Sequence, residues 1–383
     1  MTSARWVGVG RSAAADSGTA GAVARADALS GRADARLLIV FASPDHDLEA
    51  VLAGVAPGDV PLVGCSSVGE ITSHGPAERS VVVLALGGPA FSVCTRVATD
   101  ASSDLRAAGA DVARCVGTVA DRPHRTLLLL SDGLSGNQQE IVRGAYDVAG
   151  AAIPLVGGCA SDDLARKRTF VFHGGRVLRD AVVGVALGSD APLGIGVQHG
   201  WRRAGDPVLV TRAVGNRVYT LDDRPALDVY LERQGAPDAG PDEFTRLTLT
   251  HPLGLGRRSG EDYARFVRGA DFEERSLECV AAVPQGALAW FLEGDVESVL
   301  AATDGACEQA VSALGGAEPL GVIAFDCIAR RSVLGPAVEE EVARIGAVCG
   351  GAPVAGFYTY GEIARTRGVS GFHNQTLVVL AVA

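Results

Sequence analysis

Two stretches decide how this chain folds: PLVGCSSVGEI at residues 61–71 and PVAGFYTYGEI at residues 353–363. Each starts with proline, continues through small and apolar residues typical of a buried strand, and ends in Gly-Glu-Ile at the same spacing. The glycines predict a turn where the strand ends, and Glu70 and Glu362 follow that turn directly. One turn used twice indicates a repeated structural unit.

The surroundings of the two stretches repeat as well. In the first half, RTLLLLSDG (125–133) precedes a helical pattern, the strand-like PLVGGCASDD (154–163) and the apolar DAVVGVALG (180–188). In the second half, PLGVIAFDC (319–327), a helical pattern, the second quoted stretch and QTLVVLAVA (375–383) follow in the same order, offset by about 195 residues. A less distinct copy of the pattern starts at RLLIVFAS (36–43), roughly ninety residues before the first.

These patterns predict an α/β protein with mixed β-sheets, helices packed on them, and two pseudo-repeated halves. The stretch RQGAPDAGPDEF (233–244), rich in Gly, Pro and Asp, predicts the boundary between the halves. We expect a partly helical N-terminal extension over residues 1–35, a first domain over 36–232 and a second over 233–383.

Composition limits the possible functions. The net charge of −11 comes from scattered Asp and Glu, which disfavours nucleic acid and anionic membranes as partners. Lys167 is the only lysine, which argues against Schiff-base and pyridoxal chemistry, and no G-x-x-x-x-G-K-[ST] phosphate loop occurs. We expect no cofactor.

The eight cysteines form no C-x-x-C pair and mostly stand in apolar runs, which predicts reduced thiols in a cytoplasmic protein. The N-terminus lacks the continuous apolar core of a signal peptide. No stretch approaches the roughly 18 apolar residues of a membrane-spanning helix.

Further motifs follow one another in a fixed order: VGCSSVGEI, GGCASDD, VTRAVGN, DDRPALDVY and FHNQT. Together they resemble the FIST family, with its N-terminal and C-terminal domains, from about Arg36 to the end of the sequence. The resemblance implies a sensory input module of bacterial signalling that binds small ligands such as amino acids, and not an established enzyme. The family also occurs beside an F-box in eukaryotic ubiquitin-ligase receptors.

The ends of the sequence bear on how such a module would report its signal. The sequence ends at Ala383, directly after the last strand, which leaves no room for an output domain. The segment before Arg36 is too short and too poor in leucine for an F-box. We therefore expect the signal to pass to a separate signalling protein.

The turns provide the candidate ligand-binding residues. Small side chains let a ligand approach the backbone, the Cys-Ser-Ser run offers N–H and hydroxyl donors to a carboxylate, and Glu70 would meet an ammonium group. The alternative is that the glycines serve tight packing and Glu70 caps a turn or pairs with an arginine. Asp132 is added because ligands gather at the carboxyl ends of strands in α/β sheets, although helix capping explains the residues around it equally well.

Two further positions carry their own alternatives. Tyr358 and Tyr360 alternate around Thr359, so they either wall an aromatic pocket or share one face of an ordinary strand. His373 and its counterpart His173 lack a second ligand at metal-binding spacing, which favours a hydrogen-bonded histidine at a strand entrance over a metal site. The predicted ligand-binding residues are Cys65, Ser66, Ser67, Glu70, Asp132, Gly158, Ser161, Asp162, Tyr358, Tyr360, Glu362 and His373.

The leading hypothesis is a sensory module that binds an amino acid or a similar small polar metabolite between its two halves. The first alternative is a hydrolase or transferase that uses Cys65 or Ser66. Ser66 is followed by Ser67 and Val68, so the G-x-S-x-G nucleophile pattern is absent. The second alternative is a protein-interaction scaffold without a ligand.

Overall fold

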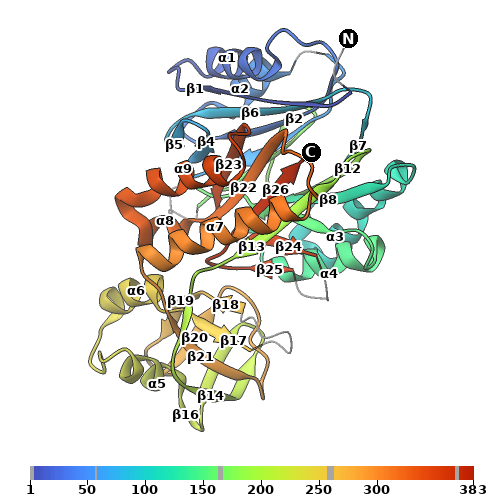
Figure 1. Cartoon of the computed structure of the whole chain (residues 1–383). Coiled ribbons are helices and arrows are strands. Elements are labelled where there is room, and N and C mark those ends of the chain that lie inside the picture. The colour runs from blue at the N-terminus through green and yellow to red at the C-terminus, as the bar shows by residue number, and fades with distance from the viewer. Residues whose placement is uncertain (1–3, 57, 163–166, 257–262, 367–370) are drawn as a thin grey trace.

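The computed structural model describes residues 4–56, 58–162, 167–256, 263–366 and 371–383 (Figure 1). Three six-stranded sheets form a body, and an eight-stranded sheet with its own helices forms a smaller part below it in the figure. The predicted α/β class with mixed sheets is confirmed. No helix among these residues is both long and apolar enough to cross a lipid bilayer.

The first sheet has the strand order β1-β6-β2-β3-β10-β11. β2 and β3 run parallel, and the other neighbouring strands of this sheet are antiparallel. Asp16 and Asp47 start its two helices by accepting backbone N–H groups, as N-caps do. Its elements are β1 (Trp6–Ser12), α1 (Ser17–Leu29), β2 (Ala35–Ala42), α2 (Leu48–Val55), β3 (Leu62–Ser66), β6 (Val81–Gly87), β10 (Val171–His173) and β11 (Arg176–Leu178).

The second sheet has the order β25-β24-β9-β8-β12-β7, with β8 and β9 parallel. Its helices α3 and α4 begin at the N-caps Asp104 and Asn137. Its elements are β7 (Phe91–Thr99), η1 (Ala101–Ser103), α3 (Leu105–Ala113), η2 (Arg114–Val119), β8 (His124–Ser131), α4 (Gln138–Ala149), β9 (Leu155–Cys159), β12 (Ala181–Ser189), β24 (Glu362–Arg365) and β25 (Phe372–His373).

The third sheet has the order β13-β26-β22-β23-β4-β5, with β22 and β23 parallel. Helix α7 packs so closely on β13 that a Cβ atom at Gly196 would lie 1.8 Å from the carbonyl oxygen of Ala306. The strands and helices of the third sheet are β4 (Glu70–Thr72), β5 (Gly75–Ala77), β13 (Leu193–Gln198), α7 (Val296–Ser312), β22 (Gly321–Cys327), α8 (Ile328–Leu334), η3 (Gly335–Ala337), α9 (Val338–Val348), β23 (Val354–Thr359) and β26 (Leu377–Val382).

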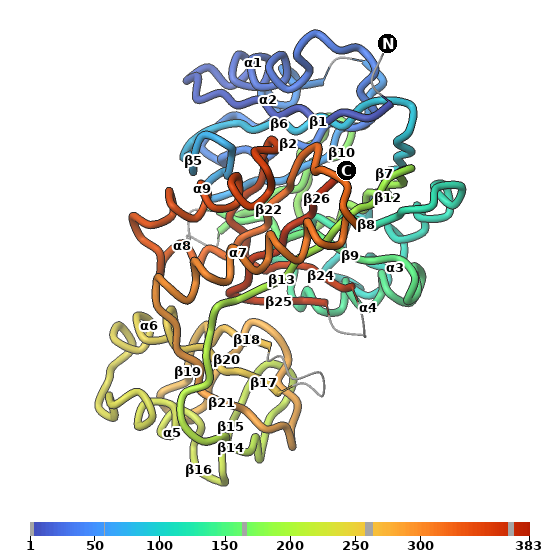
Figure 2. The backbone as a smooth tube through the Cα atoms, viewed as in Figure 1, coloured from blue at the N-terminus to red at the C-terminus, as the bar shows by residue number. Residues whose placement is uncertain are grey.

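The fourth sheet builds the smaller part, in the order β18-β17-β21-β14-β15-β20-β19 with β16 beside β15. Figure 2 shows the chain passing from β13 into this part and returning through α7. Its elements are β14 (Arg202–Val214), β15 (Arg217–Leu221), β16 (Arg224–Pro225), α5 (Ala226–Arg233), α6 (Pro241–Thr250), β17 (Leu253–Leu255), β18 (Tyr263–Arg265), β19 (Val267–Asp271), β20 (Ser276–Cys279) and β21 (Leu288–Glu293).

The three sheets of the body exchange their short hairpins in a closed cycle. After β3 of the first sheet, the chain crosses to the third sheet and forms β4 and β5. After β23 of the third sheet it crosses to the second as β24 and β25, and after β9 of the second it crosses to the first as β10 and β11. The stretches at residues 61–71 and 353–363 are two of these crossovers, and residues 154–162 begin the third.

The core of the body lies where these sheets face one another. Phe41 of the first sheet stacks on Phe357 of the third with ring centroids 4.7 Å apart, and Phe325 meets Phe357 edge-on at 5.9 Å. The same cluster takes in Leu128 and Val156 of the second sheet. One shared apolar core therefore joins sheets whose strands are far apart in the sequence.

Candidate functional site

The three crossovers meet at the centre of the body, at the carboxyl ends of β3, β9 and β23. Ser161 joins all three, because its Oγ donates to the carbonyl oxygen of Tyr358 at 2.6 Å and accepts from the backbone N–H of Val68 at 3.0 Å. The hydroxyl of Ser66 donates to the carbonyl oxygen of Ser161 at 3.0 Å. The three crossovers therefore touch one another directly.

Ser161 carries a prediction of its own. We expect Ser161→Ala to lower the free energy of unfolding by about 1–3 kcal/mol, since the buried carbonyl of Tyr358 and the partly buried N–H of Val68 lose their partner. Urea unfolding followed by circular dichroism measures this change. The matched control is Ser332→Ala, whose side chain is exposed, and equal effects of the two substitutions would contradict the assigned role.

Glu70 is buried and fully occupied by the protein's own donors. One oxygen of its carboxylate accepts from the hydroxyl of Ser67. The other accepts from the hydroxyl of Ser80 at 2.6 Å and from the N–H of Ser80 at 3.2 Å. Burial raises the pKa of Glu70 to about 7, against the lowering effect of these hydrogen bonds. The carboxylate fixes the start of β6 to the first crossover.

Glu362 occupies the matching place in the third crossover. It accepts from the hydroxyl of Thr359 and, at 3.2 Å, from the N–H of Thr376, the residue before β26. Burial raises its pKa to about 8, while the bond from Thr359 acts in the opposite direction. This group also holds a strand to a crossover, as Glu70 does.

In the second sheet Asp132 holds a neighbouring strand in the same way. It directly follows β8 and does not belong to the crossover after β9. Its carboxylate accepts from the N–H of Asp180, before β12, at 2.6 Å and from the hydroxyl of Thr169. Three carboxylates thus make equivalent contacts in three sheets. These contacts favour the capping alternative for Glu70, Asp132 and Glu362 over direct contact with a ligand.

The remaining small residues of the turns are also built into the fold. Cys65 lies inside β3, and burial raises the pKa of its thiol well above the usual value. Ser66 is fully buried, and its hydroxyl accepts from the N–H of Phe170 in addition to its bond to Ser161. Gly158 lies against β23, where a Cβ atom would come 2.8 Å from Thr359 Cγ2. A protonated thiol and a hydroxyl bonded to a carbonyl oxygen are poor nucleophiles.

The two tyrosines point to different sides of the third crossover. Tyr358 packs beneath the helices of the third sheet, 5.0 Å from the guanidinium of Arg331. Tyr360 packs beside the second core cluster, and its hydroxyl donates to the carbonyl oxygen of Asp162 at 2.7 Å. The turn after β23 separates them, so neither predicted arrangement, a shared pocket wall or one strand face, describes the pair.

Asp162 and His373 complete the predicted set. The Oδ2 of Asp162 accepts from the backbone N–H groups of Lys167 and Arg168 at 2.7 and 2.9 Å. Nε2 of His373 lies 2.9 Å from the carbonyl oxygen of Ala364. His373 is thus hydrogen-bonded, as the spacing favoured, but it is the last residue of β25 and does not stand at the entrance of a strand. Among the described residues no cluster of His, Cys, Asp and Glu is arranged to hold a metal ion.

A cavity of about 120 Å³ lies beside Tyr360, where the body meets the smaller part. It sits at the carboxyl ends of β8 and β22, the place where α/β sheets bind ligands. Helix α8 of the body and α6 of the smaller part face each other there (Figure 1). The lining residues are Gly133, Leu134, Leu249, Phe266, Arg268, Val280, Cys327, Ile328, Ala329, Ser332, Tyr360 and Asn374.

Asn374 is the polar group that distinguishes this cavity. Its side chain is 2% exposed, and its Nδ2 donates to the carbonyl oxygen of His373 at 2.9 Å. Its Oδ1 has no hydrogen-bond partner among the described residues. An unpaired buried oxygen costs about 1–3 kcal/mol, so its place on a cavity wall suits a ligand with a hydrogen-bond donor.

Arg268 and Gln375 add charge and rigidity near the cavity. Arg268 lines it and forms an ion pair with Glu278 at the surface of the smaller part. Gln375 follows Asn374 and donates from Nε2 to the carbonyl oxygen of Leu249 at 2.9 Å. Its own carbonyl oxygen accepts from the indole of Trp201 at 3.0 Å. The stretch FHNQT therefore ties the two parts together beside the cavity.

Of the residues that line this cavity, only Tyr360 is among the ligand-binding residues predicted from the sequence. The motif FHNQT contributes His373 to the predicted set, but not Asn374. The signal that would have pointed to Asn374 is a polar pair, Asn374-Gln375, directly before the apolar run TLVVLAVA. Cys327 and Arg268 carry no comparable signal.

Comparison with known proteins matches nearly the whole chain. The model of the FIST N domain matches residues 36–224, and that of the FIST C domain matches residues 226–365. A Mycobacterium tuberculosis H37Rv protein named Uncharacterized protein Rv0628c is 28% identical over 97% of both chains. Uncharacterized protein Mb0898c of Mycobacterium bovis is 30% identical over 60% of both chains. Uncharacterized protein MJ1623 of Methanocaldococcus jannaschii is 28% identical over 42% of this chain and 33% of its own.

Proposed function

The chain belongs to the FIST family, whose domains are described as sensory domains of signal transduction, and from this we propose that it binds a small polar metabolite in the cavity at Asn374. An amino acid is the first candidate. The observation that carries the proposal is the unpartnered Oδ1 of Asn374 on the cavity wall. The proposed site is therefore this cavity, at the junction of the body and the smaller part, and not the buried carboxylates of the crossovers.

The size of the cavity supports a small ligand. About 120 Å³ is close to the roughly 150 Å³ of an engineered protein cavity that binds benzene. A ligand of that size has few non-hydrogen atoms, so much of its affinity has to come from well-placed polar contacts. The amino acids with short or branched apolar side chains are of this size.

The chemistry of the wall suits an amino acid. Asn374 Oδ1 accepts a hydrogen bond from its ammonium group, and Leu249, Phe266 and Ile328 offer apolar surface to its side chain. Its carboxylate faces Arg268, whose guanidinium already pairs with Glu278 at the cavity edge. The carboxylate of the ligand would then replace part of the contact between Arg268 and Glu278.

The position of the cavity supports a sensory role. Its wall comes from both the body and the smaller part, so a bound ligand contacts both and favours one relative placement of the two. As part of the same proposal, a separate signalling protein reads this change in the cytoplasm. All eight cysteines are free thiols, which supports a reducing compartment.

The repeated architecture belongs to this proposal as well. We propose that the sheets of the body arose by duplication, since all three place a parallel strand pair beside a hairpin from another sheet. The division near residue 233 into two functional domains is supported by the family boundary between residues 224 and 226.

A thermal-shift screen of the twenty amino acids tests the proposal. We expect at least one to raise the melting temperature with concentration, because a ligand at a hundred times its Kd adds about 2.7 kcal/mol to the stability of the native state. The rise is expected to vanish in Asn374→Leu and to persist in the control Gln309→Leu, which also replaces an amide by leucine but lies on the exposed side of α7 and does not line the cavity. A rise that Asn374→Leu retains would place the ligand elsewhere, and a flat screen would favour the scaffold.

A further inference from the structure

A second and larger cavity lies on the opposite side of the body, along the free edge of the first sheet. Its volume is about 880 Å³, near the upper end of the range for small-molecule sites. One wall is seven consecutive residues, 7–13, of β1 and the segment after it. The facing wall is the turn between β4 and β5 with the residues before β23. The cavity is therefore a groove along a strand.

β1 is a sheet edge with no second neighbour among the residues that the structure describes. It pairs there with β6 alone, in a continuous register without a bulge from Trp6 to Ser12. It contains no proline and presents Val7 and Val9 to the groove. Sheet edges of this kind offer a row of N–H and C=O groups to another strand, and proteins usually blunt those with no partner.

The shape of the groove is fixed on both sides. Helix α1 packs on β1, where a Cβ atom at Gly8 or Gly10 would lie 2.0 Å from a carbonyl oxygen of the helix, and its last turn adds Ala26 and Asp27 to the lining of the groove. Across the groove, Ser73 Oγ accepts from the N–H of Val354 at 2.8 Å and holds the β4–β5 turn against the third sheet. The groove is thus formed before any partner arrives, which lowers the entropic cost of binding.

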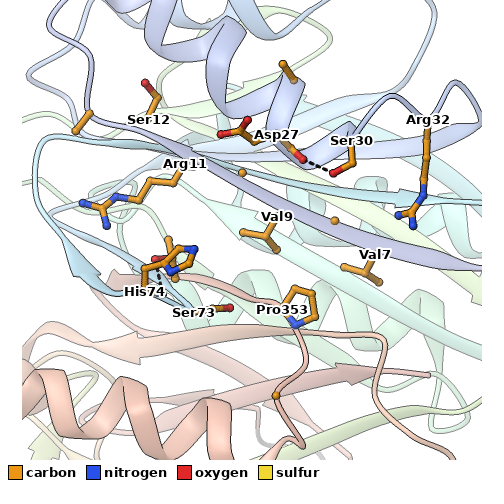
Figure 3. Close-up of a pocket in the computed structure, with 16 residues that line it drawn as sticks. Val7, Val9, Arg11, Ser12, Asp27, Ser30, Arg32, Ser73, His74 and Pro353 are labelled. Atoms are coloured by element: carbon orange, nitrogen blue, oxygen red, sulfur yellow. Dashed lines mark hydrogen bonds between the residues drawn. The ribbon is translucent and has the colours of Figure 1, made fainter.

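Basic side chains stand at the two ends of the groove. Figure 3 shows Arg11 at one end and Arg32 at the other, with Val7 and Val9 between them facing Ser73 and Pro353. Arg32 stacks on Trp6 at 4.8 Å, and neither arginine has a carboxylate partner among the described residues. The lining holds two arginines, Arg11 and Arg32, and one carboxylate, Asp27, whereas the chain as a whole carries a net charge of −11. The groove is therefore a local exception, and its two ends favour the acidic groups of a partner.

We propose that this groove binds an extended acidic segment of a partner protein, which adds a strand to β1 and places carboxylates on Arg11 and Arg32. At about 3.4 Å per residue, the five steps from Trp6 to Arg11 span roughly 17 Å. The two acidic residues of the segment therefore stand four to five positions apart, with β-branched or aromatic residues between them. Backbone hydrogen bonds provide affinity in this binding mode, and side-chain contacts provide specificity.

A peptide library tests the proposal on the full-length protein. The probes are fluorescein-labelled peptides Glu-X-X-X-Glu and Glu-X-X-X-X-Glu, with X drawn from Val, Ile, Thr, Tyr and Phe, read by fluorescence polarisation. We expect members of the library to bind, and the Arg11→Glu/Arg32→Glu variant to bind them at least tenfold more weakly. Exposed Arg246 of the smaller part provides the charge-matched control: Arg246→Glu retains binding.

Two further probes separate strand addition from simple charge attraction. The best peptide with N-methylated central residues keeps its charges but loses backbone donors, so we expect it to bind at least tenfold more weakly. The same peptide with Lys at both ends is expected to prefer the double variant. No binding across the library, equal binding of the N-methylated peptide, or equally tight binding of free glutamate would each overturn the proposal.

Discussion

Arg330→Met is expected to lower the free energy of unfolding by about 3–5 kcal/mol, because it leaves two buried carboxylates without their cation. Arg330 is fully buried in α8, and its guanidinium donates to Asp326 at 2.7 Å and to Glu341 at 2.5 Å. It also donates to the hydroxyl of Thr303 at 2.9 Å and to the carbonyl oxygen of His199 at 3.1 Å. Four elements of the third sheet and the segment before β14 therefore depend on one side chain.

The matched control for this prediction is Arg344→Met on neighbouring α9. Arg344 pairs with Asp304 and Glu340, but its side chain is 37% exposed and solvent screens these pairs. We expect a loss below about 1 kcal/mol there. Guanidinium unfolding of both variants measures the difference, and a loss at Arg330 no larger than that at Arg344 would show that the buried network does not hold α8 in place.

Stability is expected to fall by about 3 kcal/mol between pH 5 and pH 8 through Glu362 alone. Burial raises the pKa of this carboxyl from 4.5 to about 8 in the folded protein. Between these two pH values the folded state holds a proton that the unfolded state has released, so a rise in pH favours unfolding. Glu70 acts in the same direction up to about pH 7.

Glu362→Gln isolates this contribution, since glutamine stays neutral at every pH. Guanidinium unfolding at pH 5, 6, 7 and 8 is expected to show a shallower decline in the variant than in the wild type, with the two curves crossing as pH rises. Exposed Glu318 supplies the control, Glu318→Gln, which should keep the wild-type slope. Parallel curves for wild type and Glu362→Gln would mean that Glu362 is ionised in the fold at pH 5 and would refute the assignment.

The sequence predicts the strands and the mixed parallel and antiparallel sheets, because hydrophobic runs and glycine turns are local signals. The apolar runs at 125–133 and 319–327 predict strands that the structure has as β8 and β22. Their parallel pairing with β9 and β23 comes from the structure. Which sheet a short hairpin joins is a long-range choice, and nothing in ITSHGPA distinguishes pairing with β23 from pairing with β3. The exchange of hairpins between the three sheets could therefore not be predicted from the sequence.

The candidate site was harder to predict for a related reason. Glu70 and Glu362 stood out as carboxylates beside glycines, yet only the structure places the N–H of Ser80 and of Thr376 against them. Asp132 makes the equivalent contact with the N–H of Asp180, but from the end of β8. The sequence does not point to Asn374. This residue is a candidate only because its Oδ1 has no hydrogen-bond partner among the described residues and because it lines a cavity together with residues far away in the sequence.

The central claim is that a small ligand binds at Asn374, and selective ¹⁵N labelling of asparagine tests it most directly. The chain has three asparagines, Asn137, Asn216 and Asn374, so their side-chain amides give three pairs of NMR signals that single substitutions assign. On titration with the amino acids, we predict that one of them shifts the amide signals of Asn374 and leaves those of Asn137 and Asn216 in place. Signals of Asn374 that do not move with any amino acid at millimolar concentration would contradict the claim.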